Sequence, residues 1–277
     1  MPAVASARHR GIHLIDSRFL PRYKGGMPEK NLRSRLESGE TLLGSFLTWP
    51  TGGVAELLSL AGFDFVVLDT EHGVFSNESI ASTIAAADAS NLPAIVRVPS
   101  CTSPDAGRCL DYGAAGTLFP RAEGIQSVRA AVEAVKFAPE GKRGLAGVRA
   151  SKYGARPLAQ FVVEANRETL VAIQIETSGA MQDLVPISRE KNLDILYVGP
   201  NDLTQALGVP GQYGDPRYQS ALARIAAIAK EAGKVAGIML GKMEQISALR
   251  QMGYRFFTTS DRVLMMESAR AWRAALS

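Results

Sequence analysis

Short runs of apolar and β-branched residues recur along the chain, and a stretch with the apolar spacing of a helix follows each run. The runs are continuously apolar rather than alternating, which is typical of parallel strands that are covered on both faces. We therefore predict eight strands, near Leu42–Leu47, Phe63–Asp69, Ala94–Val98, Gly116–Phe119, Val171–Glu176, Ile195–Gly199, Val235–Leu240 and Phe256–Thr259.

Eight strands that alternate with helices over about 250 residues indicate an α/β fold of the (β/α)8 type, the TIM barrel. The competing fold is a doubly wound open sheet, but its glycine-rich turn G-x-G-x-x-G is missing from "WPTGGVAEL" after the first strand. The segment from Arg121 to Leu170 is too long for one helical connection. We expect its glycine-rich and basic part, "GKRGLAGVRASKYG", to form a loop over the mouth of the barrel.

The composition suits one domain with ample core, since 46% of the 277 residues are apolar. The net charge of +4 resides in residues 1–26, which hold five basic residues and one acidic residue. The rest of the chain is neutral overall and has no basic stripe, so we expect no nucleic-acid partner. We predict a basic N-terminal extension over residues 1–26, disordered in one interpretation, and a single barrel domain over residues 27–277.

The sequence contains no apolar run near the ~18 residues of a membrane span, and no apolar core of a secretion signal. We therefore expect no membrane partner and a cytoplasmic enzyme. The two cysteines, Cys101 and Cys109, indicate neither a disulfide framework nor a zinc site with His72.

Polar side chains follow four of the predicted strands, at the point where each strand ends. In a parallel barrel the carboxyl ends of the strands share one rim, where the chemistry of such barrels resides. We therefore expect these side chains to lie together: Asp69, Glu71 and His72 after the second strand, Arg97 in the third, Gln174 and Glu176 in the fifth, and Gly199, Pro200, Asn201 and Asp202 after the sixth.

Several carboxylates on one rim repel each other and do not all stay ionised without a cation. Glu176 and Asp202 follow adjacent strands, at a distance suited to sharing one metal ion. Two carboxylates plus waters favour Mg²⁺, Mn²⁺ or Co²⁺. A 2-oxo acid is well suited to replace two of the waters, and the metal then stabilises the enolate that forms when a proton leaves C3.

Structural roles are open for the same residues. Asp202 could cap the following helix, Arg97 could pair with Glu71, and His72 could be a hydrogen-bonded structural residue. Asp111 falls in the last turn of a predicted helix, where a negative charge opposes the helix dipole, and the pattern alone favours a surface residue there. No predicted strand contains a lysine, which weakens a Schiff-base aldolase mechanism.

The motifs "LDTEHG", "VRVPS", "LDYGAAGTLFPR", "PEGKRGLAGVRASKYG", "QIET" and "VGPNDLTQALG" resemble, in combination and order, those of the HpcH/HpaI family of class II (metal-dependent) 2-oxo acid aldolases. The resemblance covers nearly all of Met27–Ser277. It implies a barrel whose last helix is exchanged between subunits, commonly in a hexamer.

The same resemblance implies roles for individual residues. The divalent metal would be held by Glu176 and Asp202. Arg97 would stabilise the enolate, and His72 would be the acid/base group, with its basicity raised by Asp111. The 2-oxo acid would be held by Gln174 and by the segment of Gly199, Pro200, Asn201 and Asp202. Asp69 and Glu71 would contact these site residues without touching the substrate or the metal.

The leading functional hypothesis is a lyase that joins or separates a pyruvate enolate and an aldehyde, in sugar-acid or aromatic catabolism. Its substrates would be 4-hydroxy-2-oxo acids, such as 4-hydroxy-2-oxoheptanedioate or 2-dehydro-3-deoxy-glucarate. The alternatives are a decarboxylase or condensing enzyme that uses oxaloacetate, and a non-catalytic barrel that binds 2-oxo acids. The chain departs from the family pattern in two places: Glu71–Phe75 stands where E-H-A-P-N is frequent, and Arg97–Pro99 where R-P-P is frequent.

Overall fold

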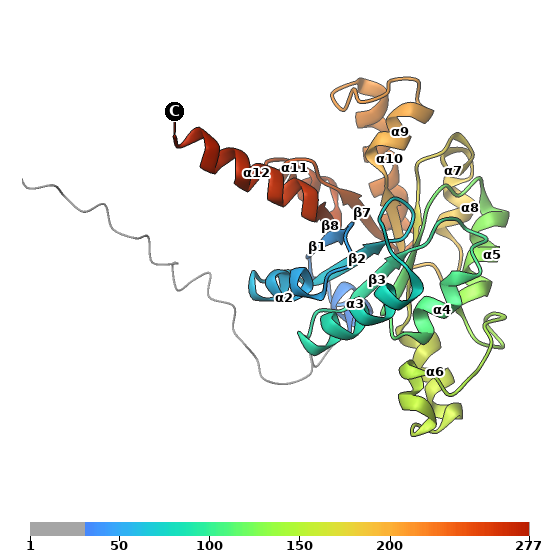
Figure 1. Ribbon diagram of the computed structural model, residues 1–277. Coiled ribbons are helices and arrows are strands. Elements are labelled where there is room, and N and C mark those ends of the chain that lie inside the picture. The colour runs from blue at the N-terminus through green and yellow to red at the C-terminus, as the bar shows by residue number, and fades with distance from the viewer. Residues whose placement is uncertain (1–30, 277) are drawn as a thin grey trace, which may run out of the picture.

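The computed structural model describes residues 31–276. Eight parallel strands form one closed barrel in chain order, which confirms the predicted fold (Figure 1). The strands are β1 Leu42–Leu47, β2 Phe65–Asp69, β3 Ala94–Arg97, β4 Gly116–Phe119, β5 Leu170–Gln174, β6 Ile195–Val198, β7 Val235–Met239 and β8 Tyr254–Ser260. The predicted extension over residues 1–26 lies outside the described residues.

Most of the helices surround the barrel and connect successive strands, whereas the first precedes β1 and the last follows β8 (Figure 1). Their bounds are α1 Leu32–Glu37, α2 Gly52–Leu60, α3 Asn77–Ala89, α4 Asp105–Asp111, α5 Ile125–Val135, α6 Leu158–Glu168, α7 Ser178–Gln182, α8 Leu184–Ser188, α9 Pro200–Ala206, α10 Pro216–Glu231, α11 Gln245–Met252 and α12 Asp261–Ala274. None of the helices in the described part of the chain has the length and apolarity to cross a membrane.

The core has two parts, because the strands place alternate side chains on opposite faces. Aromatic side chains fill the barrel interior, where the rings of Phe65 and Phe256 stack with centroids 4.3 Å apart. Gly44 on β1 is paired in register with Phe65, and a Cβ at Gly44 would collide with that ring. The second part of the core lies between the outer face of the strands and the helices.

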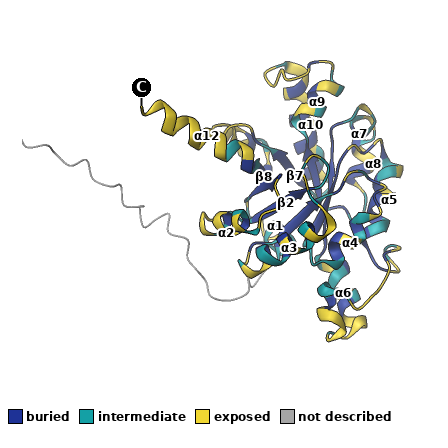
Figure 2. Cartoon of the chain, viewed as in Figure 1, coloured by how far each residue is buried: buried dark blue, intermediate teal, exposed yellow. Residues whose placement is uncertain are grey.

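The last helix, α12, extends away from the barrel and is exposed along most of its length (Figure 2). Its large apolar side chains Met265, Met266 and Trp272 are exposed. An apolar surface of this kind fits the predicted exchange of the last helix between subunits, which stays a prediction.

The basic loop that contains "GKRGLAGVRASKYG" does not cover the mouth of the barrel, so that expectation is wrong. Arg149 pairs with Asp88 at 2.6 Å and donates to the carbonyl of Tyr112 at 2.9 Å. Asp88 lies in the last turn of α3, and Tyr112 is the C-cap of α4. Because both helices run antiparallel to the strands, their carboxyl ends lie at the amino-terminal end of the barrel, and the loop contacts that end. A cation is favourable there, because the carbonyl ends of helices carry partial negative charge.

Candidate active site

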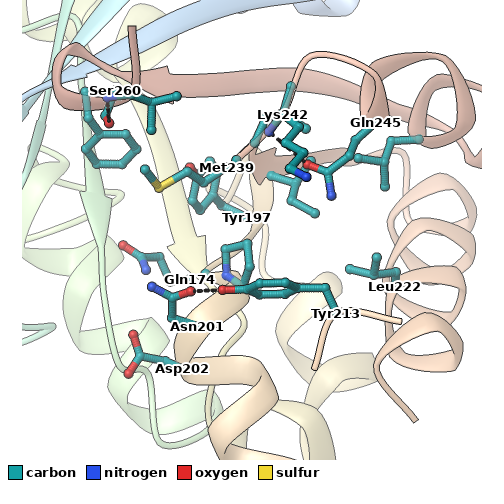
Figure 3. Close-up of a pocket in the computed structure, with 18 of the residues that line it drawn as sticks. Gln174, Tyr197, Asn201, Asp202, Tyr213, Leu222, Met239, Lys242, Gln245 and Ser260 are labelled. Carbon is teal, nitrogen blue, oxygen red and sulfur yellow. Dashed lines mark hydrogen bonds between the residues drawn. The ribbon is translucent and has the colours of Figure 1, made fainter. Parts of the chain in front are cut away.

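A cavity of about 540 Å³ opens at the carboxyl ends of the strands. Phe46, Asp69, Arg97 and Gln174 line one part of it, together with the segment from Gly199 to Asp202. His72 lines the same part. The close-up in Figure 3 shows Gln174, Asn201 and Asp202 on this side of the cavity. The structure therefore brings together most of the rim residues that the sequence predicts.

Arg97 and Asp69 form a two-pronged ion pair between neighbouring strands. Arg97 Nε donates to Asp69 Oδ1 at 3.0 Å, and Nη2 donates to Oδ2 at 2.7 Å. The Asp69 carboxylate also accepts the backbone N–H of His72 at 3.1 Å, and Asp69 is 1% exposed. One buried carboxylate therefore fixes both the guanidinium and the backbone that carries His72.

Glu71 connects Arg97 and His72. Its Oε2 lies 3.2 Å from Arg97 Nη1 and 3.8 Å from His72 Nε2. Burial raises the pKa of Glu71, and the charge of Arg97 opposes that rise. The His72 side chain is 60% exposed at the mouth of the cavity, so it is accessible to a bound substrate.

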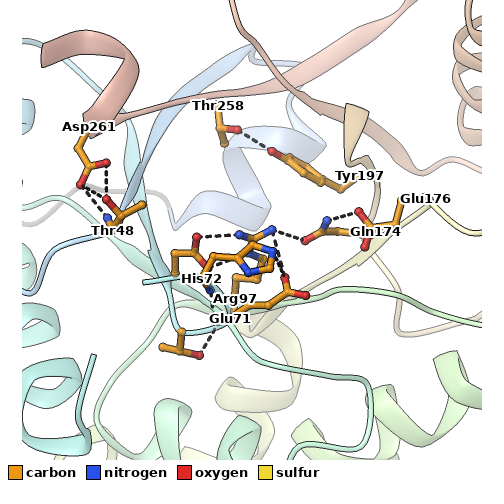
Figure 4. A network of polar contacts seen from close by, with 11 residues as sticks. Thr48, Glu71, His72, Arg97, Gln174, Glu176, Tyr197, Thr258 and Asp261 are labelled. Atoms are coloured by element: carbon orange, nitrogen blue, oxygen red, sulfur yellow. Dashed lines mark hydrogen bonds and ion pairs between the residues drawn. The ribbon is translucent and has the colours of Figure 1, made fainter. Parts of the chain in front are cut away.

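Gln174 links the guanidinium to the buried Glu176 (Figure 4). Arg97 Nη1 donates to Gln174 Oε1 at 3.4 Å, and Gln174 Nε2 donates to Glu176 Oε2 at 2.5 Å. The backbone N–H of Arg121 donates to the other Glu176 oxygen at 2.8 Å. A continuous polar chain thus crosses the barrel mouth from β2 to β5.

Glu176 and Asp202 carry negative charge that the described residues do not balance. Burial raises the pKa of Glu176 to about 7, and the nearby Asp202 charge adds to the rise. Asp202 lies in the first turn of α9, whose N-cap is Gly199, and its carboxylate has no hydrogen-bond or ion-pair partner among residues 31–276. A cation beside both carboxylates would satisfy them.

The backbone at Gly199 lies against the Glu176 carboxylate and leaves no room for a side chain. A Cβ at position 199 would collide with Glu176 Oε2 and would lie 2.9 Å from Gln174 Nε2. Within residues 31–276, no group of three or more histidine, cysteine, aspartate or glutamate side chains could hold a metal ion. Glu176 and Asp202 would give a two-carboxylate donor set, in which water or substrate oxygens would complete the coordination of a hard divalent cation.

Within one chain, Asp111 lies far from the other predicted site residues. It is in the last turn of α4 and pairs with Arg143 at 2.8 Å. Arg143 follows α5 and is stacked 4.4 Å from the ring centroid of Phe137. Both residues are thus at the amino-terminal end of the barrel, whereas His72 is at the carboxyl end. The effect of Asp111 on His72 stays a prediction, and it requires Asp111 from another subunit.

Two residues of the site and one contact between neighbouring strand ends were missed in the sequence. The Arg121 N–H is a backbone donor, which no side-chain pattern reveals. Tyr213 Oη donates to Asn201 Oδ1 at 2.5 Å from the loop after α9. Asp261 accepts the Thr48 N–H at 2.7 Å, although 213 residues separate them. Two signals in the sequence could have indicated them. Tyr213 lies in the turn-like segment "GQYGDP", and Asp261 directly follows the eighth strand.

Acidic, basic and amide groups gather at the carboxyl ends of the strands, which is where TIM-barrel enzymes have their active sites. Residues 43–262 match the HpcH/HpaI aldolase/citrate lyase family, and the chain belongs to that family. It is therefore a carbon–carbon lyase.

Relatives and solved structures agree with this assignment. The hydroxypyruvate/pyruvate aldolase of Paraburkholderia phytofirmans is 35% identical over 252 residues, which are 88% of this chain and 95% of the relative. A solved HpcH/HpaI aldolase/citrate lyase family protein from Burkholderia cenocepacia is 33% identical, with a TM-score of 0.83 over 89% of this chain and 99% of that one. The crystal structure of the citrate synthase SbnG is 29% identical, with a TM-score of 0.81 over 88% of this chain and 96% of that one.

Proposed function

We propose that this enzyme is a divalent-metal-dependent aldolase that joins pyruvate, or a related 2-oxo acid, to an aldehyde and cleaves the corresponding 4-hydroxy-2-oxo acid. The observation that carries the proposal is the polar chain from Asp69 through Arg97 and Gln174 to Glu176. Along this chain a fixed cation, an amide and a buried carboxylate lie side by side at one end of the cavity. An enolate-forming reaction needs these three kinds of group together.

Glu176 and Asp202 would hold Mg²⁺, Mn²⁺ or Co²⁺. When bound, the ion acts as a Lewis acid toward the oxygens of the 2-oxo acid. Ionised Glu176 is stabilised by the Arg121 N–H and the Gln174 amide, which leave lone pairs on both carboxylate oxygens. The unpaired Asp202 carboxylate supplies the second protein ligand.

Arg97 would bind the oxygen that becomes negative as the C3 proton leaves. Asp69 holds two guanidinium nitrogens, so Nη1 is the nitrogen directed toward Gln174 and Glu71. The Phe46 ring lies 4.9 Å from the guanidinium carbon and limits its movement. A cation fixed in this way needs little reorganisation as charge develops.

His72 would accept the C3 proton of pyruvate and return a proton to the aldehyde oxygen after the C–C bond forms. Its backbone is fixed by Asp69, and its side chain reaches the cavity. Glu71 Oε2 lies 3.8 Å from His72 Nε2. We propose a homo-oligomer, with a hexamer as the expected form, in which Asp111 of a neighbouring subunit would lie near His72.

A decarboxylase or condensing enzyme that uses oxaloacetate is the second candidate. The similarity to the citrate synthase SbnG favours it, because its sequence and fold match those of this chain over 88% of the residues. The two candidates share enolate formation and differ in the electrophile that follows. Comparing the rates of oxaloacetate decarboxylation and 4-hydroxy-2-oxo acid cleavage with the same enzyme preparation separates them.

The proposal is tested by incubating the enzyme with pyruvate, a panel of aldehydes and each of Mg²⁺, Mn²⁺ and Co²⁺. We expect a product whose mass equals pyruvate plus the aldehyde, found by mass spectrometry and only with metal. The Glu176→Gln variant is the negative control. An unchanged product yield after complete removal of divalent metal would contradict the proposal.

A further inference from the structure

Tyr213 connects the loop after α9 to the polar end of the cavity. Its Oη donates to Asn201 Oδ1 at 2.5 Å, and its ring packs edge-on against Tyr218 with centroids 5.9 Å apart. All three residues line the cavity. In Figure 3 the Tyr213 ring extends from the side of Leu222 to Asn201, which lies next to Asp202. A hydroxyl from this loop thus contacts the segment that follows β6.

The loop that carries Tyr213 is held on both sides of the tyrosine. Before it, the Gly211 N–H donates to Thr204 Oγ1 at 3.0 Å, and Thr204 Oγ1 donates to the Asn201 carbonyl at 2.7 Å. After it, the Gln219 amide donates to the Tyr213 carbonyl at 2.6 Å. Gly211 has a φ of +72°, a conformation that glycine adopts without steric cost. The hydroxyl therefore reaches Asn201 from a backbone that is already fixed.

The hydrogen bond from Tyr213 determines how the Asn201 amide is oriented. An asparagine side chain accepts at its oxygen and donates at its NH₂ group, and the two ends have nearly the same shape. The Tyr213 hydroxyl binds the oxygen end, and Figure 3 shows the nitrogen end on the side of Gln174 and Asp202. The negative charge of Asp202 favours this orientation, because it would repel a carbonyl oxygen on that side. Asn201 thus presents N–H donors to the polar end of the cavity.

These N–H donors are unused within the described part of the chain. The Asn201 carbonyl accepts from Thr204 and its side-chain oxygen accepts from Tyr213, but no acceptor among residues 31–276 binds the Nδ2 hydrogens. Asn201 is exposed at the cavity wall rather than packed in the core. A donor that is already oriented loses little freedom when a ligand binds, which favours affinity.

We propose that Tyr213 is a positioning residue that orients the Asn201 amide to donate to the carboxylate of the bound 2-oxo acid, a role that rests on the aldolase function proposed above. Arg97 binds the oxygen that becomes negative in that function, so the substrate carboxylate needs a donor of its own. A neutral amide suits this place, because a cation beside Asp202 would form an ion pair with the carboxylate that the metal needs. Tyr213 thus raises the affinity for the 2-oxo acid and takes no part in proton transfer.

The test measures exchange of pyruvate methyl protons in D₂O over a series of pyruvate concentrations, with saturating Mn²⁺ and no aldehyde. Tyr213→Phe keeps the ring against Tyr218 and removes only the hydroxyl. We expect the half-saturating pyruvate concentration to rise about threefold to tenfold, as for the loss of one hydrogen bond, while the maximal exchange rate stays within about twofold of native. Tyr153→Phe, at a 77% exposed position outside the cavity, is the matched control and should change neither quantity. A native half-saturating concentration in Tyr213→Phe would overturn the proposal.

A double-mutant cycle shows whether Tyr213 acts through Asn201. Asn201→Ala removes the donor itself, so we expect the half-saturating pyruvate concentration to rise at least as much as in Tyr213→Phe. Tyr213→Phe introduced into Asn201→Ala should have no further effect, because no amide remains to be oriented. Effects of the two substitutions that multiply in the double variant would contradict the positioning role.

The affinity for Mn²⁺ separates this role from a structural effect on the metal site. Titration of metal-free protein with Mn²⁺ in the absence of pyruvate should give the same dissociation constant for Tyr213→Phe and the native enzyme. A weaker affinity in Tyr213→Phe would assign the hydroxyl to the support of Asp202 and contradict the proposal. Absence of exchange in the native enzyme would instead contradict the aldolase function, whereas native exchange with an unaltered Tyr213→Phe variant contradicts the positioning role alone.

Discussion

The Cα of Gly199 lies so close to the Glu176 carboxylate that a Cβ at position 199 would overlap Oε2. Gly199 follows β6 and Glu176 follows β5, so the contact joins two neighbouring strand ends. The closeness brings the backbone before Asp202 beside Glu176, and the Asp202 charge adds to the rise in the pKa of Glu176.

Gly199→Ala should displace Glu176 or Gln174 and weaken metal binding. We expect at least a tenfold loss of activity at low metal concentration, and a loss of stability of about 1–3 kcal/mol, which is typical of an overpacked site. Metal titration and thermal unfolding measure the two effects. Gly144→Ala, where an added Cβ meets nothing within 4 Å, is the control. Native metal affinity in Gly199→Ala would show that the contact is not needed.

The stability of the metal-free enzyme should fall as the pH rises from about 5 to about 8. The pKa of Glu176 is raised to about 7 by burial and by Asp202, above its unfolded value of 4.5, so the native state binds more protons in this range. Its ionisation costs on the order of 3 kcal/mol. Thermal unfolding of chelator-treated enzyme checks this, and Glu176→Gln should flatten the dependence. An equal slope in both proteins would assign it to other groups.

Arg97→Lys should lose most activity although the charge is kept. A lysine cannot make the two-pronged bond to Asp69 and also reach Gln174, and it loses the planar contact with Phe46. We expect kcat to fall on the order of 10²-fold or more, as for removal of an oxyanion-stabilising donor. Steady-state kinetics measure this, with Arg250→Lys on α11 as the control. A change confined to KM would assign Arg97 to binding alone.

Asp111→Asn should affect stability and pH dependence separately. The Arg143 side chain is 4% exposed and loses its ionic partner, so we expect a loss of about 1–3 kcal/mol in thermal unfolding. If Asp111 of a neighbouring subunit also contacts His72, the pH–rate profile should shift to lower pH. Arg143→Met removes the same ion pair and serves as the comparison. A profile shift of equal size in both variants would attribute the shift to the lost ion pair.

The fold could be predicted from the sequence because the strands are mostly continuous apolar runs, which is typical of parallel strands covered on both faces, and eight such runs alternate with helices. The rim residues were predictable for the same reason, since the position of a residue in its strand determines which end of the barrel it occupies. His72, Arg97 and Glu176 were all found in this way.

Contacts between distant parts of the chain were not predictable. The Thr48–Asp261 bond joins residues 213 positions apart, and the Arg149–Asp88 pair directs a basic loop to the amino-terminal end of the barrel. Neither follows from local periodicity, because both depend on which segments become neighbours after the barrel closes.

We propose that the site residues convert pyruvate to its enolate with the help of a divalent metal and His72. Exchange of pyruvate methyl protons in D₂O, followed by NMR, tests it most directly. We predict exchange by the native enzyme with Mn²⁺, none above background after chelation, and a loss on the order of 10²–10⁴-fold in His72→Ala, as for removal of a general base. Exchange at the native rate in chelated enzyme, or in His72→Ala, would contradict the claim.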